Sequence, residues 1–154
     1  MYVVRPFITY RAIEIDAGAT AIGLIGAIYA LFPVLLALKF GSWVGKYGEG
    51  KFLVVGTFSL IASCTSLVLT NNVVTLAIAT AFAGLSHLAL MVGGQTMVAL
   101  RAPKSDYNRL FGYYTFSASL GHTFGPVIAG LLAGSLANGM PKHSNYAFFF
   151  AIAL

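Results

Sequence analysis

The feature that most constrains the fold of this chain is a set of four long stretches. They contain no charged side chain, apart from His122 in the last of them. They occupy residues 17–38, 52–69, 73–100 and 110–136. About 20 apolar residues of α-helix are enough to cross the hydrocarbon core of a bilayer, which is about 30 Å thick. The sequence therefore predicts an all-α integral membrane protein, a polytopic helix bundle with four complete spans.

Two shorter apolar segments lie at the ends of the chain. Residues 1–15 carry Arg5 and Arg11, and residues 146–154 are too short to cross a bilayer at a helical rise of about 1.5 Å per residue. We interpret these segments as the end of a first span and the start of a sixth. Residues 1–154 would then form one bundle that is truncated at both ends. Interfacial segments at both ends are the alternative.

The composition disfavours most soluble functions. Hydrophobic residues make up 58% of the chain and charged residues 8%, whereas soluble domains carry about 25% charged residues. The net charge of +5 has no polar face on which to form a nucleic-acid site. His87, His122 and His143 lie in three different segments, without paired carboxylates at metal-ligand spacing. We predict no metal ion, no cofactor, no enzymatic activity and no nucleic-acid partner.

Basic residues alternate between the connections. Residues 39–51 and 101–109 are basic, whereas residues 70–72 carry no charge and residues 138–145 carry a single lysine. Loops rich in Lys and Arg usually face the cytoplasm. The pattern predicts a multi-pass protein of the cytoplasmic (inner) or plasma membrane, with residues 39–51 and 101–109 as cytoplasmic loops.

The first basic loop reads GSWVGKYGEGK from Gly41 to Lys51. An ordinary basic turn accounts for such a loop. Its place between the second and third spans also resembles the signature loop of the major facilitator superfamily, Gly-x-Leu-Ala-Asp-Arg-x-Gly-Arg-Arg. Gly41, Lys46 and Gly48 match in kind and spacing, while Gly45 replaces the family's Asp. The resemblance implies that this loop, with Lys46 and Lys51, is a gating loop that latches two halves of a transporter.

The fifth apolar run contains a regular set of glycines. Gly112, Gly121, Gly125, Pro126 and Gly130 resemble the fifth-helix motif of antiporters in the same family, Gly-x8-Gly-x3-Gly-Pro-x2-Gly-Gly, with Ala at the penultimate position. In lipid, Gly and Pro are tolerated because neighbouring groups satisfy the freed backbone. Plain helix packing is the alternative explanation. The resemblance implies a seam between the two halves and export by exchange.

Several polar side chains are expected at bilayer depth, where they are costly unless they are used. The fourth run places small or polar residues at helical spacing on one stripe. That stripe consists of Thr80, Gly84, His87, Met91 and Gln95. Our candidates for lining a substrate cavity are Arg5, Tyr29, His87, Met91, Gln95 and Tyr113. His87 can alternatively bond a neighbouring helix, and Arg5 can hold an anion, pair with a buried carboxylate or extend to the membrane surface.

Together these features resemble the N-terminal six-helix half of a major facilitator superfamily transporter. The resemblance implies alternating access around a site at the membrane midplane, with proton-coupled efflux or antiport of a drug-like or metabolite substrate. The implied partners are the lipid bilayer, a small-molecule substrate, protons and the missing C-terminal half of the same transporter. A family importer working as a uniporter or symporter, and a non-transporting membrane scaffold or receptor bundle, are the alternatives.

Overall fold

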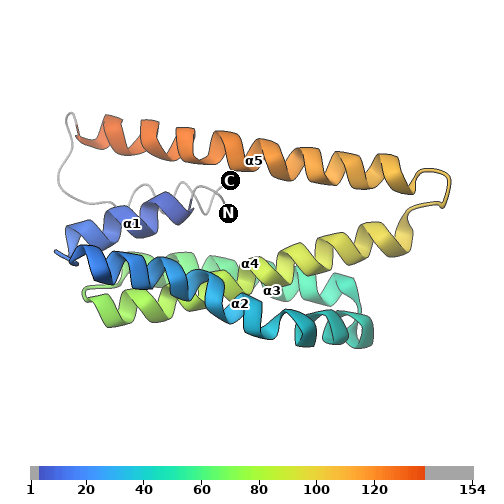
Figure 1. Cartoon of the computed structure of the whole chain (residues 1–154), viewed down its shortest axis with the longest axis horizontal. Coiled ribbons are helices and arrows are strands. Elements are labelled where there is room, and N and C mark those ends of the chain that lie inside the picture. The colour runs from blue at the N-terminus through green and yellow to red at the C-terminus, as the bar shows by residue number, and fades with distance from the viewer. Residues whose placement is uncertain (1–3, 138–154) are drawn as a thin grey trace.

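The computed structural model describes residues 4–137, which form a helix bundle without any strand (Figure 1). This confirms the predicted all-α class. The expected segment at residues 146–154 lies outside the described residues. The helices are α1 (Val4–Glu14), α2 (Ala19–Tyr47), α3 (Glu49–Val68), α4 (Val73–Arg101) and α5 (Tyr107–Ala137).

Helices α2, α3 and α4 are long and apolar enough to cross a membrane. The 29 residues of α2 and of α4 each span about 44 Å at 1.5 Å per residue, which exceeds a hydrocarbon core of about 30 Å. The expected fourth span, residues 110–136, falls within α5, whose 31 residues give it the necessary length. The 11 residues of α1 cover about 16 Å, or about half of the core.

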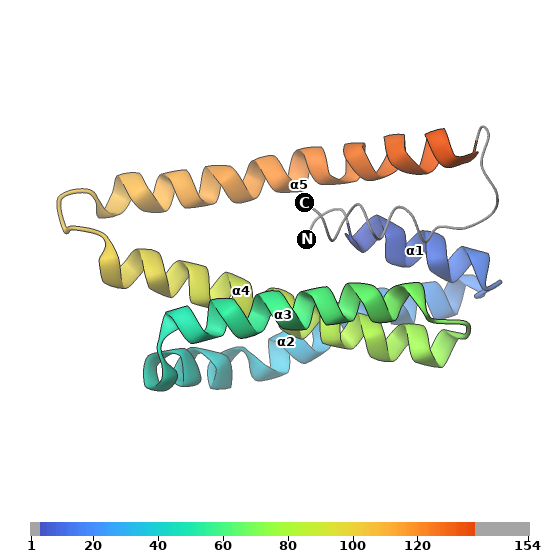
Figure 2. The ribbon, with the colours of Figure 1, turned by 180° about the vertical axis from the view of Figure 1, so that it is seen from behind.

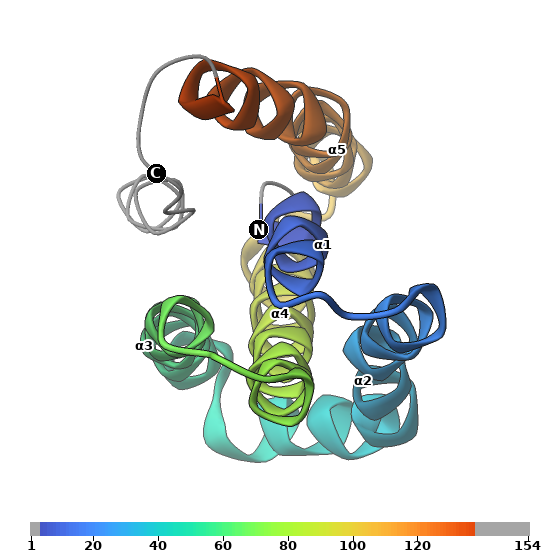
Figure 3. The same ribbon diagram turned by 90° about the vertical axis from the view of Figure 1, so that its left-hand side faces the viewer.

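Helix α4 is the centre of the bundle. It packs most extensively against α3 and α2, which lie on either side of it in the view along the long axis (Figure 3). Helix α1 lies beside α4 between these two, and α5 lies beyond α1. Seen from behind, α3 runs along α4 over much of its length (Figure 2). The short connections make sequential neighbours antiparallel, as the run lengths predict.

The buried core joins α1 to the helices around it. Large apolar side chains such as Leu38 remain exposed on the outside of the bundle, as expected for a surface that faces lipid. The inner side chains come from all five helices. They are Val4, Phe7, Ile8, Ala12, Ile25, Tyr29, Cys64, Leu67, Leu76, Ala79, Ala83 and Ala129.

The expected loop at residues 39–51 is almost entirely helical, and this part of the prediction was wrong. Helix α2 continues to Tyr47 and α3 begins at Glu49, so that Gly48 alone joins them. Gly41, Lys46 and Lys51 are therefore helical. The charges and glycines mark where the helices leave the apolar layer. The helical backbone hydrogen bonds continue beyond that point, since the Gly48 N–H still donates to the Val44 carbonyl at 2.9 Å. Gly48 has φ +90°, a conformation that suits glycine.

The two basic segments meet at one end of the bundle. Arg101 at the end of α4 forms an ion pair with Glu49 at the start of α3, with Nη2 and Oε1 2.9 Å apart. The turn at residues 70–72 lies at the opposite end, where Arg11 donates to the Thr70 carbonyl at 2.7 Å and pairs with Glu14 at 2.8 Å (Figure 1). The structure thus places both segments that are predicted to be cytoplasmic on the same side.

Candidate functional site

Helices α2 and α4 touch backbone to backbone at Gly84. Pro33 has no N–H, so the Tyr29 carbonyl four residues earlier lacks its helical donor. A methyl group added at Gly84 would collide with this carbonyl oxygen and lie 3.4 Å from Cγ of Pro33. Only glycine permits this close crossing. Beyond it, the second half of α2 runs beneath α4 towards α3 (Figure 3).

The crossing places the Tyr29 side chain between α1 and α4. Tyr29 Oη and His87 Nδ1 share a hydrogen bond of 2.8 Å, and their rings meet edge to face. From the other side, the guanidinium carbon of Arg5 lies 4.5 Å from the centre of the Tyr29 ring, a cation–π contact. Three of the predicted cavity residues, from three helices, are therefore in one contact chain.

Beside this chain lies a cavity of about 330 Å³ between α1, α2 and α4. Its wall combines aliphatic side chains with the polar groups of Arg5, Thr9, Tyr29 and Thr80. Thr80 is fully buried, and its Oγ1 has no hydrogen-bond partner among the described residues. The complete lining is Arg5, Ile8, Thr9, Ala12, Ile22, Ile25, Gly26, Tyr29 and Thr80.

The helical rise places this cavity near the middle of a bilayer. Arg5 precedes Glu14, at the end of α1, by nine residues, which correspond to about 14 Å along the axis. Tyr29 follows Ala19, at the start of α2, by ten residues, or about 15 Å. Both helix ends lie at the same end of the bundle (Figure 1). Because half of a hydrocarbon core is about 15 Å, both side chains start close to its midplane.

The other predicted cavity residues lie along α4 and α5. Met91 is half-buried, and its carbonyl and Sδ lie 3.4 and 3.5 Å from Tyr114 Oη. Gln95 is exposed, and Tyr113 has 61% of its surface exposed on the outside of α5. Tyr114, and not the predicted Tyr113, therefore reaches α4. Helical periodicity could have identified it, since Tyr114 lies seven residues before Gly121 and on the same face.

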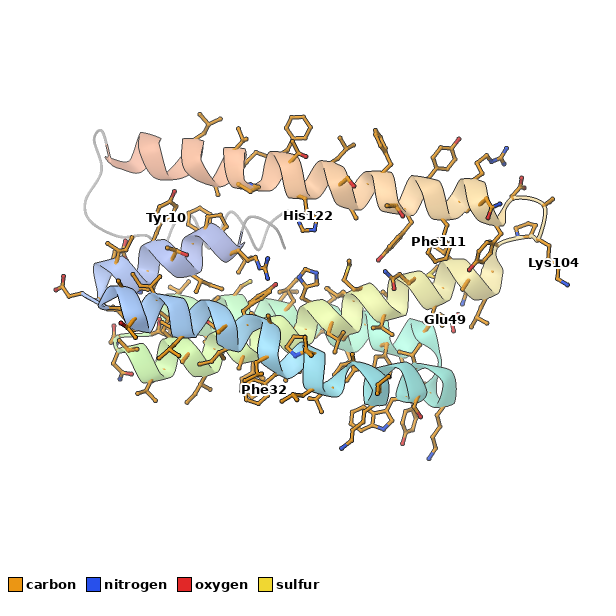
Figure 4. The ribbon with its side chains drawn as sticks, in the orientation of Figure 1. Tyr10, Phe32, Glu49, Lys104, Phe111 and His122 are labelled. Carbon is orange, nitrogen blue, oxygen red and sulfur yellow. The ribbon has the colours of Figure 1, made fainter. Side chains whose placement is uncertain are left out.

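The glycine motif of α5 is divided between two faces. Gly125 is buried and Gly121 half-buried on the side that faces the other helices, where Figure 4 also shows Phe111 and His122. The remaining motif residues are exposed. They are Gly112, Pro126 and Gly130. A methyl group added at Gly112 or Gly130 would meet no atom within 4 Å.

Two larger cavities lie against α3 and α4, but the serine and threonine hydroxyls that line them are already paired. One, of about 590 Å³, is lined by several hydroxyl groups, among them Ser63, which donates to the Ser59 carbonyl at 2.8 Å. The other, of about 480 Å³, also borders α2. It combines aromatic and aliphatic side chains with Ser59 and Ser86, whose hydroxyls share a bond of 2.7 Å. Neither offers a buried unpartnered group comparable to Thr80, so the smaller cavity is the better candidate site.

The predicted gating positions stand at the basic end. Lys46 lies 5.5 Å from the centre of the Tyr47 ring, and Lys51 is exposed one turn into α3. Gly41 is exposed in α2, with open space around it. The contact that links the two basic segments within this chain is the pair of Glu49 and Arg101.

Known proteins similar to this chain include two that are named for drug resistance and one that is named as a transporter. Multidrug resistance protein 1 of Bacillus subtilis is 27% identical over 140 residues, covering 91% of this chain and 34% of that protein. An uncharacterized MFS-type transporter of Methanocaldococcus jannaschii is 29% identical, with 90% and 36% covered. Quinolone resistance protein NorA of Staphylococcus aureus is 26% identical, with 90% and 34% covered.

The chain spans about a third of the length of the curated relatives that it matches. The family model described as Major Facilitator Superfamily matches residues 1–154. This confirms the family suggested by the basic segment after the second span and by the glycine motif of the fifth. This chain belongs to the major facilitator superfamily and is a multi-pass integral membrane protein.

Proposed function

We propose that this chain forms half of a secondary active transporter that moves a small solute across the membrane by alternating access. The observation that carries the proposal is the cavity between α1, α2 and α4. It lies near the membrane midplane, where transporters of this type bind their solutes. It also contains the Arg5 guanidinium and the unpartnered Thr80 hydroxyl, and polar groups at that depth are costly unless they serve a function.

Export in exchange for protons is the form of transport that we propose. The names of two relatives refer to multidrug and quinolone resistance, and the α5 motif resembles that of antiporters. Helices α2, α4 and α5 contain no Asp or Glu, and the only acidic residue of α3 is Glu49 at its first position. Glu14 and Asp16 lie at or beyond the end of α1, about 14 Å or more along the chain axis from Arg5. Unless one of them serves from that end, a proton carried near the cavity would use a histidine, either His87 or His122.

Two open faces of small residues support the proposal that a second half packs against this one. The first, on α5, consists of the exposed motif residues Gly112, Pro126 and Gly130. The second, on α2, follows helical spacing along the exposed surface. It consists of Gly23, Ala27, Ala30, Gly41 and Gly45. Small side chains allow close approach of another membrane helix.

The test is gradient-driven uptake by everted vesicles that contain the full-length gene product. With an acidic interior, we expect accumulation of a fluorescent quinolone, and a protonophore should abolish it. Gly130→Leu should lower uptake by about tenfold or more, because overpacking a helix contact costs about 1–3 kcal/mol and 1.4 kcal/mol is a factor of ten. The variant should still insert, since the position is open in this half.

Gly18→Leu is the matched control, because it places the same side chain at another exposed, open glycine, directly before α2. It should leave uptake unchanged. Normal uptake by Gly130→Leu would reject the packing of a second half on this face of α5. The absence of any gradient-dependent movement of a quinolone, ethidium or a neutral dye would reject the proposed transport.

A further inference from the structure

The Thr80 hydroxyl differs from the other buried hydroxyls of α3 and α4. Ser63 and Ser86 each donate to the carbonyl four residues earlier in their own helix, at 2.8 Å. Thr70 donates to the Leu67 carbonyl at 2.8 Å. Thr80 makes no such bond, although it is fully buried and lines the cavity. Since a buried hydroxyl without a partner is destabilising, a ligand in the cavity is the natural partner for this one.

Arg5, on α1, brings a positive charge to the lining of the same cavity. The ion pairs among the described residues join Arg11 to Glu14, Arg101 to Glu49, and Arg109 to Asp106, so none of them involves Arg5. The lining of the cavity contains no Asp or Glu. Its positive charge is thus not balanced by the described protein groups around the cavity, and a bound anion would balance it.

We propose that this cavity binds the carboxylate of a small monoanionic solute between the Arg5 guanidinium on α1 and the Thr80 hydroxyl on α4. The inference rests on the proposed transport and names its substrate class. A planar guanidinium matches a carboxylate with two parallel hydrogen bonds, and the threonine hydroxyl donates to the same group. The single cation favours one negative charge over the two of a phosphate monoester.

The other residues that line the cavity indicate the polarity and size of the rest of the solute. Ile8, Ile22 and Ile25 form an apolar wall beside the polar groups. The volume of about 330 Å³ lies at the lower end of the range for ligand pockets, about 300–1,000 Å³. A compact aromatic or aliphatic carboxylate satisfies both conditions. Tyr29 is a positioning residue, because its ring holds the Arg5 guanidinium while its hydroxyl is bonded to His87.

Binding of radiolabelled benzoate to the purified full-length gene product in detergent tests this inference. Benzamide and benzamidine have nearly the same shape but carry no charge and a positive charge, respectively. We expect unlabelled benzoate to compete at least roughly tenfold better than either, because a charge-assisted hydrogen bond is about twice as strong as a neutral one and the positive ligand is repelled. Benzamidine competing best, or no measurable benzoate binding, would overturn the proposal.

Variants then assign the binding to the two residues. Arg5→Gln and Thr80→Val should each weaken benzoate binding by about tenfold or more, since each leaves the carboxylate one partner short. Thr80→Ser keeps the hydroxyl, so it should retain most of the affinity and show that the site still folds. Arg5→Lys keeps the charge but loses the planar pair of donors, so its affinity should lie between those of Arg5→Gln and the wild type. Lys104→Gln removes a cation from the exposed 102–106 connection and should change nothing. Wild-type affinity in Arg5→Gln would overturn the proposal.

The outcomes separate this inference from the proposed function. Quinolone transport by vesicles whose protein shows no preference for benzoate would leave transport standing and reject the anion site. A benzoate preference that depends on Arg5 and Thr80, in a protein that moves no solute, would support the anion site and reject transport.

Discussion

Replacing Gly84 with Ala tests the backbone contact on which the site is built. The added methyl group would collide with the Tyr29 carbonyl oxygen and lie 3.2 Å from the carbonyl carbon. These are backbone atoms, which cannot rotate away as the end of a side chain can, so α2 must shift. We expect a cost at the upper end of the range for overpacking, about 3 kcal/mol. The gain in helix propensity from Gly to Ala, up to about 1 kcal/mol, offsets part of it.

Gly112→Ala is the matched control for this prediction. A methyl group there meets no atom within 4 Å, and the residue also lies inside a membrane helix. The propensity gain is common to both variants, so the difference between their unfolding free energies isolates the overpacking, about 3 kcal/mol. Gly94→Ala should fall between them, because the atoms nearest to its methyl group belong to the Tyr114 side chain, with Cε2 at 3.1 Å, and a side chain can move aside.

The measurement is reversible unfolding of the purified protein in mixed micelles as the fraction of denaturing detergent increases. Gly84→Ala should unfold at a lower detergent fraction than the wild type, and Gly112→Ala at the same or a higher fraction. Equal stability of the Gly84 and Gly112 variants would refute the reasoning, because it would mean that α2 and α4 do not meet at this carbonyl. In a stable Gly84→Ala protein, benzoate binding should still weaken, since the shift of α2 displaces Tyr29, whose ring contacts Arg5.

Two further predictions concern the basic end. Gly48→Ala should lower the unfolding free energy by about 1–3 kcal/mol, because a side chain at φ +90° and ψ 144° is strained. Gly50→Ala, at a helical position, should leave the unfolding free energy unchanged or raise it slightly. Equal stability of these two variants in the same assay would count against the strained connection. Glu49→Arg and Arg101→Glu should each reduce transport by placing like charges together, and the double exchange should restore it, since it rebuilds the pair with reversed sign. Failure of the double exchange to recover activity would show that transport does not depend on the ion pair between these two residues.

The fold was predictable because run length alone decides it. A charge-free stretch as long as residues 73–100 can only be accommodated as a membrane helix or a deeply buried one, and α4 has almost these bounds. The extent of α2 was not predictable in the same way. Glycines and lysines report the end of the apolar layer, and the backbone remains helical until Gly48 permits a change of direction.

The site was only partly predictable, because a sequence gives the face of a helix but not its neighbour. Spacing placed Thr80, Gly84 and His87 on one stripe, and the structure shows that Gly84 and His87 both meet Tyr29. Nothing in the spacing indicates that Pro33 frees a carbonyl opposite Gly84. The sequence also could not predict that the Thr80 hydroxyl lacks a hydrogen-bond partner, since Ser63 and Ser86, in α3 and α4, donate to their own backbone.

The single residue between α2 and α3 limits how these two helices can move relative to each other. Consecutive Cα atoms are about 3.8 Å apart, so the ends of the two helices can never separate by more than about 8 Å. Glu49, the next residue, is bonded to the end of α4. At this end of the bundle α2 and α3 therefore move together, and the ion pair favours a position of α4 beside them. Helix α5, which the longer 102–106 connection joins to α4, is less constrained here.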